Sequence, residues 1–145
     1  MTKPTTNEVL DRLHHLMHGL RRHLRDAMRN DGEGLGPMEA RCLAFFARRD
    51  GATQRDLVQH TGRDKAQIAR VVRLLHERGL LHSRPDPDDG RSQRVSATAE
   101  GLALQRRMQQ HLARFEKAMT AGLDERERTT LLALLDRLRD NVGEV

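Results

Sequence analysis

Aromatic side chains are almost absent from this sequence. Its 145 residues include three Phe, no Tyr and no Trp, so aromatics make up 2% of the chain. Sandwiches and barrels fill their sheet faces with aromatic and β-branched residues, so the composition argues against an all-β fold. The same shortage argues against proteins that stack single-stranded bases on exposed rings. Leu, Ala, Arg, Gln and Met are plentiful instead, and these residues favour helices.

Cysteine and long apolar runs are also scarce. The one cysteine, Cys42, cannot form an intramolecular disulfide, which fits a reducing cytoplasm. The first residues, 1–7, are polar and contain no apolar signal core. No window approaches about 18 uncharged apolar residues, the length that crosses a membrane. We therefore expect a soluble cytoplasmic protein without a membrane partner.

Catalytic and cofactor motifs are missing as well. The eleven Gly lack the spacing of a phosphate-binding loop, and the serines occur only at positions 83, 92 and 96, with no Ser/His/acid arrangement. We expect neither an enzyme nor a bound cofactor.

Helical periodicity covers most of the chain. Val9, Leu13, Leu16 and Leu20 recur at helical spacing and predict one long amphipathic helix over residues 7–29. Proline at a first helical turn, Pro37, predicts a second helix that ends near Arg49. Possible caps and stops predict further helices from Thr53 to about Thr61, from Asp64 to Gly79, from about Ala99 to Ala121, and from Asp124 through Val142.

One stretch has the pattern of a hairpin. Residues 80–84 and 91–96 are predicted strands, and a Pro/Asp/Gly turn at 85–90 separates them. The short helix before Thr61, the turn at 61–63, the helix after Asp64 and this hairpin form a helix-turn-helix with a wing. Six basic residues between positions 61 and 84 exceed the two acidic ones by four, which is most of the net charge of +5. The positive charge therefore lies where DNA would bind.

Three segments, in this order, resemble the MarR family of bacterial transcription regulators. They are Leu75-His76-Glu77-Arg78-Gly79-Leu80-Leu81, Asp89-Gly90-Arg91, and Val95-Ser96-Ala97-Thr98-Ala99-Glu100-Gly101. The family has Leu-x-x-x-Gly-Leu after the recognition helix, Asp-x-Arg in the wing, and Val-x-Leu-Thr-x-x-Gly before the next long helix. The helix order, with Leu35-Gly36-Pro37 opening the second helix, extends the resemblance over nearly the whole chain. Ala97 departs from the usual Leu, which we expect to weaken packing under the wing.

The resemblance implies a mainly α fold with a small two- or three-stranded wing, a winged helix-turn-helix joined to a helical dimerisation region. Arg91 would be the wing-tip arginine in the minor groove, and Asp89 would hold a basic side chain such as Arg73. The remaining candidates for DNA contacts are long polar side chains of the recognition helix, its flanking turn and the wing. They are Arg63, Lys65, Gln67, Arg70, Arg73, Arg84 and Arg94.

The helices outside the winged unit suggest a dimer. We assign residues 1–145 to one MarR-type domain, in which 53–101 form the DNA-binding unit. Helices 7–29 and 99–142 then have apolar faces that this small unit cannot cover, and a second copy would cover them. Two recognition helices on a twofold axis read a palindromic operator. We therefore expect a homodimeric, sequence-specific regulator of transcription, a repressor released by a small-molecule effector.

The effector site is less well defined by the sequence. By the resemblance, Met17, Arg41, Cys42, Phe45 and Met108 are candidates for a pocket lining. With so few rings in the chain, such a site should depend on Met, Leu, His and Arg. Cys42 fits an inert packed thiol better than an oxidant sensor. His14 and His18, with His111, could instead bind zinc, although a neighbouring His pair is commonly a solvated face.

Other functions stay open at this point. A zinc- or oxidant-responsive regulator of the same fold is one alternative, and a nonspecific architectural DNA-binding protein is another. The groove-facing Gln67 argues against the second, because glutamine reads base edges. A metal- or thiol-dependent enzyme lacks the required ligand cluster.

Overall fold

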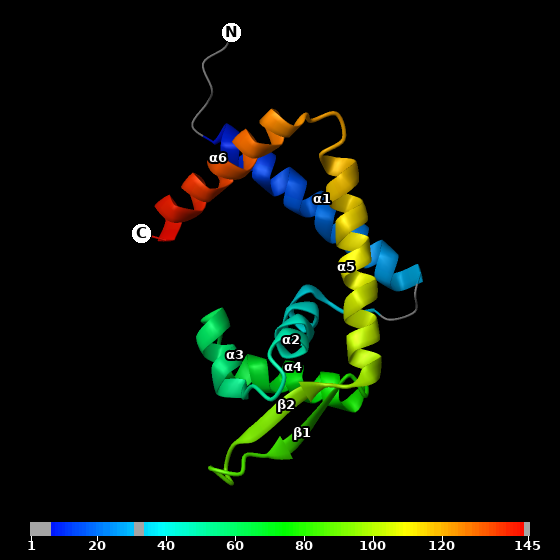
Figure 1. The fold of residues 1–145 in the computed structure, drawn as a ribbon, viewed down its shortest axis with the longest axis vertical. Helices are drawn as coiled ribbons and strands as arrows, with labels where there is room; N and C mark the ends of the chain where they lie inside the picture. Colours follow the sequence, from blue (N-terminus) through cyan, green and yellow to red (C-terminus); the bar gives the residue numbers. More distant parts are fainter. Residues whose placement is uncertain (1–6, 31–33, 144–145) are drawn as a thin grey trace. The chain divides into compact units, whose positions relative to one another are not determined.

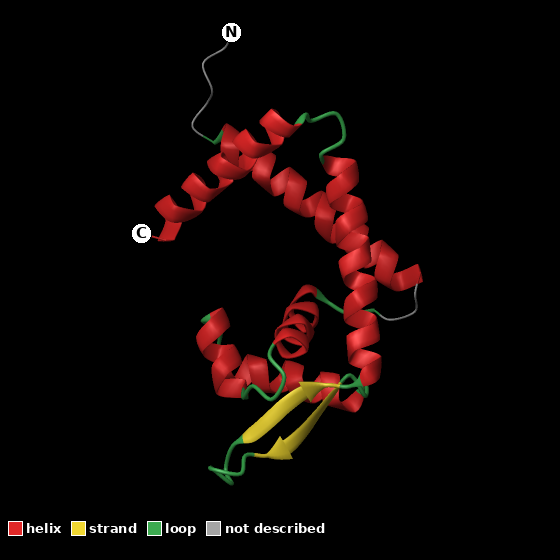
Figure 2. Ribbon diagram, in the orientation of Figure 1, coloured by secondary structure: helices red, strands yellow, loops and turns green. Residues whose placement is uncertain are grey.

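The computed structural model describes residues 7–30 and 34–143. This part of the chain is mainly helical with one hairpin, which confirms the predicted fold class (Figures 1 and 2). In chain order the elements are α1 (Glu8–Asn30), α2 (Pro37–Arg48), α3 (Gln54–Thr61), α4 (Lys65–Glu77), β1 (Leu81–Pro85), β2 (Gln93–Ala97), α5 (Ala99–Met119) and α6 (Glu125–Gly143). The chain divides into two compact units, residues 1–111 and 112–145, which we describe separately.

An apolar core organises the first unit. Helix α4 buries Ile68, Val71, Val72 and Leu75, the stripe that its sequence spacing predicted. Side chains from α1, α2, α3, the hairpin and α5 complete this core, among them Met28, Leu43, Phe46, Leu57, Leu81, Val95 and Leu104. Ala97 is partly buried against the same cluster. Helix α4 is therefore held in place by its inner face, which leaves its outer face free for polar side chains.

The wing is a two-stranded antiparallel hairpin with one extra bridge. Leu81 pairs with Ala97 at its base and Pro85 with Gln93 at its far end. The Val95 amide donates to the Ala52 carbonyl at 2.8 Å, and the Gly51 amide donates to the Val95 carbonyl at 3.0 Å. This bridge takes the place of a third strand and ties the hairpin to the segment that enters α3.

Local hydrogen bonds explain where elements depart from their predicted ends. Strand β2 begins at Gln93 rather than Arg91, because the Asp89 carboxylate accepts from the Arg91 amide at 3.1 Å and holds the wing turn. Strand β1 begins at Leu81, because the Leu80 amide donates to Leu75 at the end of α4. Helix α5 ends at Met119, two positions before Ala121, just ahead of Gly122 with φ of +87°.

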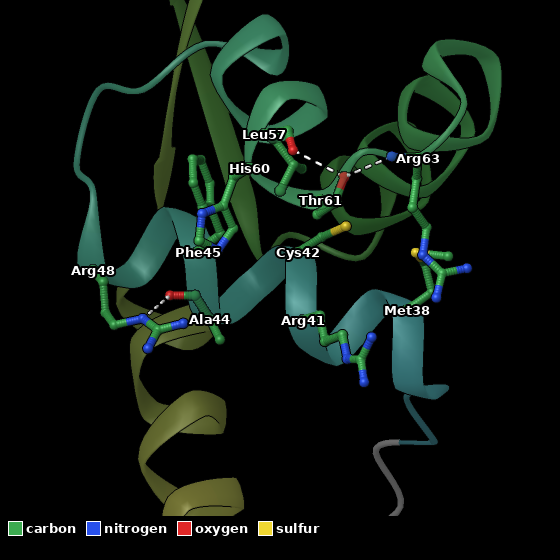
Figure 3. Close-up of a pocket in the computed structure, with 10 residues that line it drawn as sticks. All are labelled: Met38, Arg41, Cys42, Ala44, Phe45, Arg48, Leu57, His60, Thr61 and Arg63. Carbon is green, nitrogen blue, oxygen red and sulfur yellow. Dashed lines mark hydrogen bonds between the residues drawn. The ribbon is translucent and has the colours of Figure 1, made fainter. Parts of the chain in front are cut away.

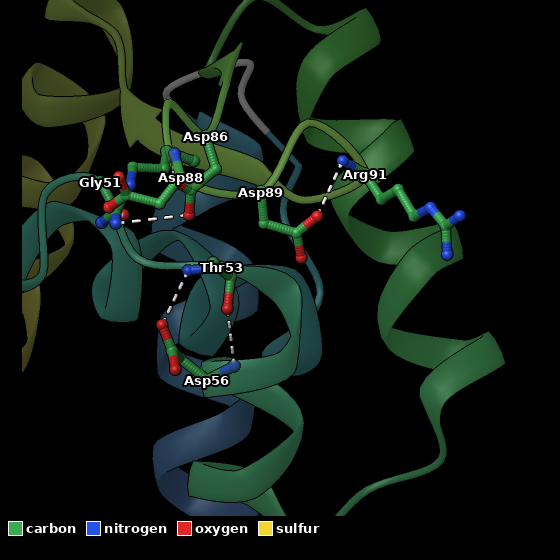
Figure 4. Close-up of polar contacts among 8 residues, drawn as sticks. Gly51, Thr53, Asp56, Asp86, Asp88, Asp89 and Arg91 are labelled. Atoms are coloured by element: carbon green, nitrogen blue, oxygen red, sulfur yellow. Dashed lines mark hydrogen bonds and ion pairs between the residues drawn. The ribbon is translucent and has the colours of Figure 1, made fainter.

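The predicted caps at the helix-turn-helix are confirmed. The Asp56 amide donates to the Thr53 hydroxyl at 3.1 Å, and the Thr53 amide donates to the Asp56 carboxylate at 2.9 Å (Figure 4). The Asp64 carboxylate caps α4 by accepting from the Gln67 amide at 3.2 Å. Between them, Gly62 takes the left-handed conformation with φ of +64° that the tight turn requires.

A close backbone approach joins the wing to α5. The Thr98 hydroxyl donates to the Gly79 carbonyl at 2.6 Å and accepts from the Gly101 amide at 3.0 Å. A Cβ atom at Gly101 would collide with the Leu80 carbonyl oxygen and lie 3.3 Å from a methyl group of Leu43. A residue without a side chain is therefore required where α5 leaves the wing.

We predict that Gly101→Ala lowers the free energy of unfolding by about 1–3 kcal/mol, because the added methyl group overpacks a rigid backbone contact. Gly19→Ala is the matched control, since Gly19 also lies in a helix but has nothing within 4 Å of the position of a Cβ. The control should be stabilised, because alanine favours helix more than glycine does. Thermal unfolding followed by circular dichroism measures both variants, and an unchanged midpoint for Gly101→Ala would contradict the packing argument.

Candidate nucleic-acid interface

The outer face of the recognition helix carries the predicted polar side chains. Arg63, Lys65, Arg70 and Arg73 are exposed and Gln67 is partly buried. Gln67, Arg70 and Arg73 line a shallow hollow of about 470 Å³ between α4 and α2, beside Glu39 and Glu77. In the described chain, none of the four basic side chains forms an ion pair. Their hydrogen-bond donors therefore stay available to an outside acceptor.

Arg91 lies at the exposed end of the wing. Its backbone is fixed by Asp89, whereas its side chain points away from the turn (Figure 4). Among the described residues this guanidinium has no hydrogen-bond or ion-pair partner. A free arginine at the tip of a thin hairpin has the shape and charge that the minor groove accepts.

The wing carboxylates have different partners from those expected. Asp89 accepts from the Arg91 amide and, within the described chain, forms no ion pair with Arg73. Asp86 is the carboxylate that holds a basic side chain, because its Oδ2 lies 3.3 Å from Nη2 of Arg94. From the sequence Asp86 is only a turn residue between two prolines, and nothing in that position indicates Arg94 as its partner.

Arg94 is anchored rather than free. Its Nη1 donates to the Gly51 carbonyl at 3.2 Å while its Nη2 pairs with Asp86, so the guanidinium joins the wing to the loop before α3. Arg84 lies opposite Arg94 in the strand register and is exposed. Of the two predicted strand arginines, Arg84 is therefore the one whose donors remain unpaired in the described part of the chain.

The Asp56 carboxylate of the capping box is affected by its hydrogen bonds to Thr53 and by nearby arginines. The pKa of Asp56 is lowered from its ordinary 3.8, chiefly because the Thr53 amide donates to the carboxylate, although partial burial opposes the shift. The Thr53 hydroxyl and the positive charges of Arg49 and Arg94 lower it further. The cap therefore contributes its stability above the ordinary pKa of Asp56 and loses it as the pH falls through the lowered value.

The structure divides the predicted effector residues. Arg41, Cys42 and Phe45 line a pocket of about 430 Å³ between α2 and α3 (Figure 3). Met108 is instead buried in the core, and Met17 is 40% exposed on α1, so neither lines this pocket. His60 and Arg48 also line the pocket. Neither is indicated by the sequence, because no local pattern shows that α3 lies against this side of α2.

Cys42 is a packed thiol. It is fully buried, and its pKa is raised to about 11, mainly by burial and secondly by the charge of Glu39, while Arg63 opposes the shift. A thiol with so high a pKa stays protonated at neutral pH and is therefore a poor nucleophile there.

The predicted metal-binding histidines do not form a cluster. Over residues 7–30 and 34–143, no three His, Cys, Asp or Glu side chains come together as ligands for a metal ion. Within the same ranges, no helix is long and apolar enough to cross a membrane.

Comparison with known proteins shows a similarity to one family of regulators. The sequence model described as the MarR family matches residues 33–92, which include α2, the helix-turn-helix and most of the wing. Over these residues the chain is similar to the MarR family. The chain is 27% identical over 112 residues to the uncharacterized HTH-type transcriptional regulator YdgJ of Bacillus subtilis, an alignment that covers 77% of the chain and 68% of YdgJ. It is 32% identical over 106 residues to a transcriptional regulatory protein assigned to the hcr operon of Thauera aromatica, covering 73% and 64% of the two.

Solved structures show the same fold. FabT of Streptococcus pneumoniae, crystallised in complex with DNA, superposes with a TM-score of 0.88 at 11% identity, covering 97% of this chain and 99% of FabT. At this identity the likeness concerns the fold alone.

We predict that the Arg94 anchor stabilises the wing locally. Arg94→Gln and Asp86→Asn should each speed amide hydrogen exchange at Val95 and Gly51 about two- to fivefold, because a partly exposed ion pair contributes about 0.5–1 kcal/mol. Asp88→Asn is the control, since in the described chain its carboxylate has no partner. Exchange rates measured by NMR that are equal in all three variants would show that Arg94 does not hold the wing.

Proposed function

We propose that this protein is a cytoplasmic, sequence-specific regulator that binds double-stranded DNA as a homodimer on a palindromic operator. It acts as a repressor that a small-molecule effector releases. The observation that carries the proposal is the set of unpaired basic side chains on one winged helix-turn-helix: Arg63, Lys65, Arg70 and Arg73 at the recognition helix and Arg91 at the wing tip.

The geometry supports two groove contacts. Helix α4 is fixed through its buried stripe and presents its polar side outward, which is how a recognition helix enters a major groove. Gln67 and Arg70 can hydrogen-bond base edges there, and Arg91 can reach the adjacent minor groove. The fold shared with the DNA-bound FabT is consistent with this arrangement. A nonspecific architectural protein would need only phosphate contacts, and the glutamine on the groove face favours sequence reading over that alternative.

Uncovered apolar faces support a homodimer. Helix α6 has no buried residue, and Leu131, Leu135, Leu138 and Val142 recur along one side of it with 37% to 75% exposure. Helix α1 likewise exposes Val9, Leu10 and Leu16. Exposed apolar stripes on long helices mark protein contacts, and a second copy is the economical occupant. We assign the DNA-binding unit to residues 53–101 and the dimer contacts to helices within 7–29 and 99–142.

Arg91→Ala should weaken binding to an operator duplex and to a scrambled duplex by a similar factor. The wing tip reads groove shape and charge rather than base identity, so the plot of log affinity against log salt should lose about one unit of slope. Fluorescence anisotropy over a salt series measures both quantities. Arg106→Ala removes the same charge from an exposed position of α5 and is the control. Unchanged operator affinity and salt slope for Arg91→Ala would contradict the assigned role.

Light scattering at micromolar concentration should give twice the chain mass of 16.6 kDa. Leu135→Glu should raise the dimer dissociation constant by about a hundredfold or more, because each subunit would bury a charge in place of a leucine. Ala133→Glu, on the opposite side of α6, is the matched control and should remain dimeric. A wild-type mass of one chain would refute the dimer, and equal dissociation by both variants would remove α6 from the interface.

A further inference from the structure

One side of helix α1 carries only arginine and histidine side chains over most of its length. At 3.6 residues per turn, six exposed side chains between positions 14 and 29 fall within about 100° of arc around the helix axis. They are His14, His18, Arg21, Arg22, Arg25 and Arg29, which we call the α1 stripe. No other residue of this interval lies in the arc, and Asp11, the one carboxylate of the described helix in line with it, comes before the interval.

The arginines of the α1 stripe have no carboxylate partner. Among the described residues their guanidinium groups form no ion pair and no hydrogen bond. Arg12 differs, because it lies on the opposite side of α1 and pairs with Glu8 at 3.1 Å. Like charges four positions apart on a helix repel one another, as Arg21, Arg25 and Arg29 do. An anion that lies along the stripe would remove this repulsion.

The α1 stripe is separate from the surfaces already assigned. Met28, near the end of α1, is the one described residue of this helix in the apolar core, so the stripe takes no part in packing the winged helix-turn-helix. The apolar side of α1, with Val9 and Leu16, is turned by more than about 100° from the stripe. A dimer that covers the apolar side therefore leaves the stripe facing outward.

The length and chemistry of the α1 stripe fit an extended polyanion. Helix α1 is continuous (Figure 1), so at 1.5 Å per residue the ends of the stripe lie about 22 Å apart. A DNA duplex carries one negative charge per about 1.7 Å of its axis, so several phosphates can meet the stripe at once. Guanidinium groups bind phosphate oxygens through paired hydrogen bonds. The stripe has no Phe, Tyr or Trp for stacking single-stranded bases and no apolar side chain for entering a lipid surface.

We propose that the α1 stripe binds the phosphate backbone of a second DNA duplex segment, so that the protein bridges two segments of DNA. The bridging rests on the proposed function, in which the winged helix-turn-helix holds the first segment. Once that segment is bound, another part of the same DNA molecule is present at a high effective concentration. A contact with the backbone alone, which is weak and independent of sequence, is then sufficient.

A capture assay with two duplexes tests the bridging. The first duplex is enriched from a random-sequence pool by its binding to this protein, immobilised, and loaded with the protein. Free protein is washed away, and a fluorescent duplex of scrambled sequence is added. The loaded surface should retain the scrambled duplex, because the α1 stripe is still unoccupied, and added salt should release it. A loaded surface that retains no scrambled duplex would overturn the proposal and leave the proposed regulator intact.

Two double variants of equal charge locate the second contact. Arg21→Gln/Arg25→Gln should reduce the retained scrambled duplex about tenfold and lower its salt slope by about two units, because two phosphate contacts are lost. Its affinity for the first duplex should stay unchanged. Arg12→Gln/Arg106→Gln removes two charges from exposed positions outside the α1 stripe and should behave as the wild type does. Glutamine favours helix about as well as arginine, and circular dichroism verifies the fold of both variants. Equal retention by the two variants would overturn the assignment to α1.

Titrations of the free protein separate this proposal from the proposed function. Scrambled duplex should bind the Arg21→Gln/Arg25→Gln variant more weakly than it binds the Arg12→Gln/Arg106→Gln control. If the pool yields no preferred duplex and this difference persists, the sequence-specific function is refuted while α1 remains a duplex-binding surface. Single-stranded DNA or phosphatidylglycerol vesicles are added as competitors at equal phosphate concentration. A competitor that displaces the scrambled duplex from the loaded protein as well as unlabelled duplex does would overturn the assignment to duplex DNA.

Discussion

The contact between Gly101 and the Leu80 carbonyl is the constraint on which the DNA-binding face depends. Helix α4 ends, strand β1 begins and α5 starts within one small volume, and the Thr98 hydroxyl joins Gly79 to Gly101 there. Backbones can approach this closely only where a side chain is missing. The junction therefore joins the wing to α4 and helps to set the direction of the hairpin relative to that helix.

The positive charge around the wing is the second organising feature. The positions of the carboxylates determine which arginines are ion-paired and which are not. Asp86 and Gly51 engage Arg94, which therefore serves the wing, whereas Arg91 and the arginines of the α2–α3 pocket are left unpaired in the described chain. Unpaired guanidinium groups attract anions. Arg63 lies in the turn before α4 and also lines that pocket.

Much of the local structure could be predicted because its causes are local. The stripe from Ile68 to Leu75, the capping box of Thr53 and Asp56 and the stop at Gly79 depend on residues within a few positions of one another. The predicted ends of strands differ from the observed ends where a turn residue binds a backbone amide that a strand would otherwise use. Asp89 holds the Arg91 amide, and the strand begins later as a result.

The sequence by itself determined the helical composition, the winged helix-turn-helix and the concentration of basic residues around it, since periodicity, caps and charge are properties of short segments. Only the tertiary structure decided which arginines are free, because the partners of Arg94 come from a distant loop and an unremarkable turn. It also brought His60 and Arg63 to Arg41 across two helices, while it left Met17 and Met108 elsewhere. Contacts between segments follow from how their apolar faces pack, and no local pattern encodes that arrangement.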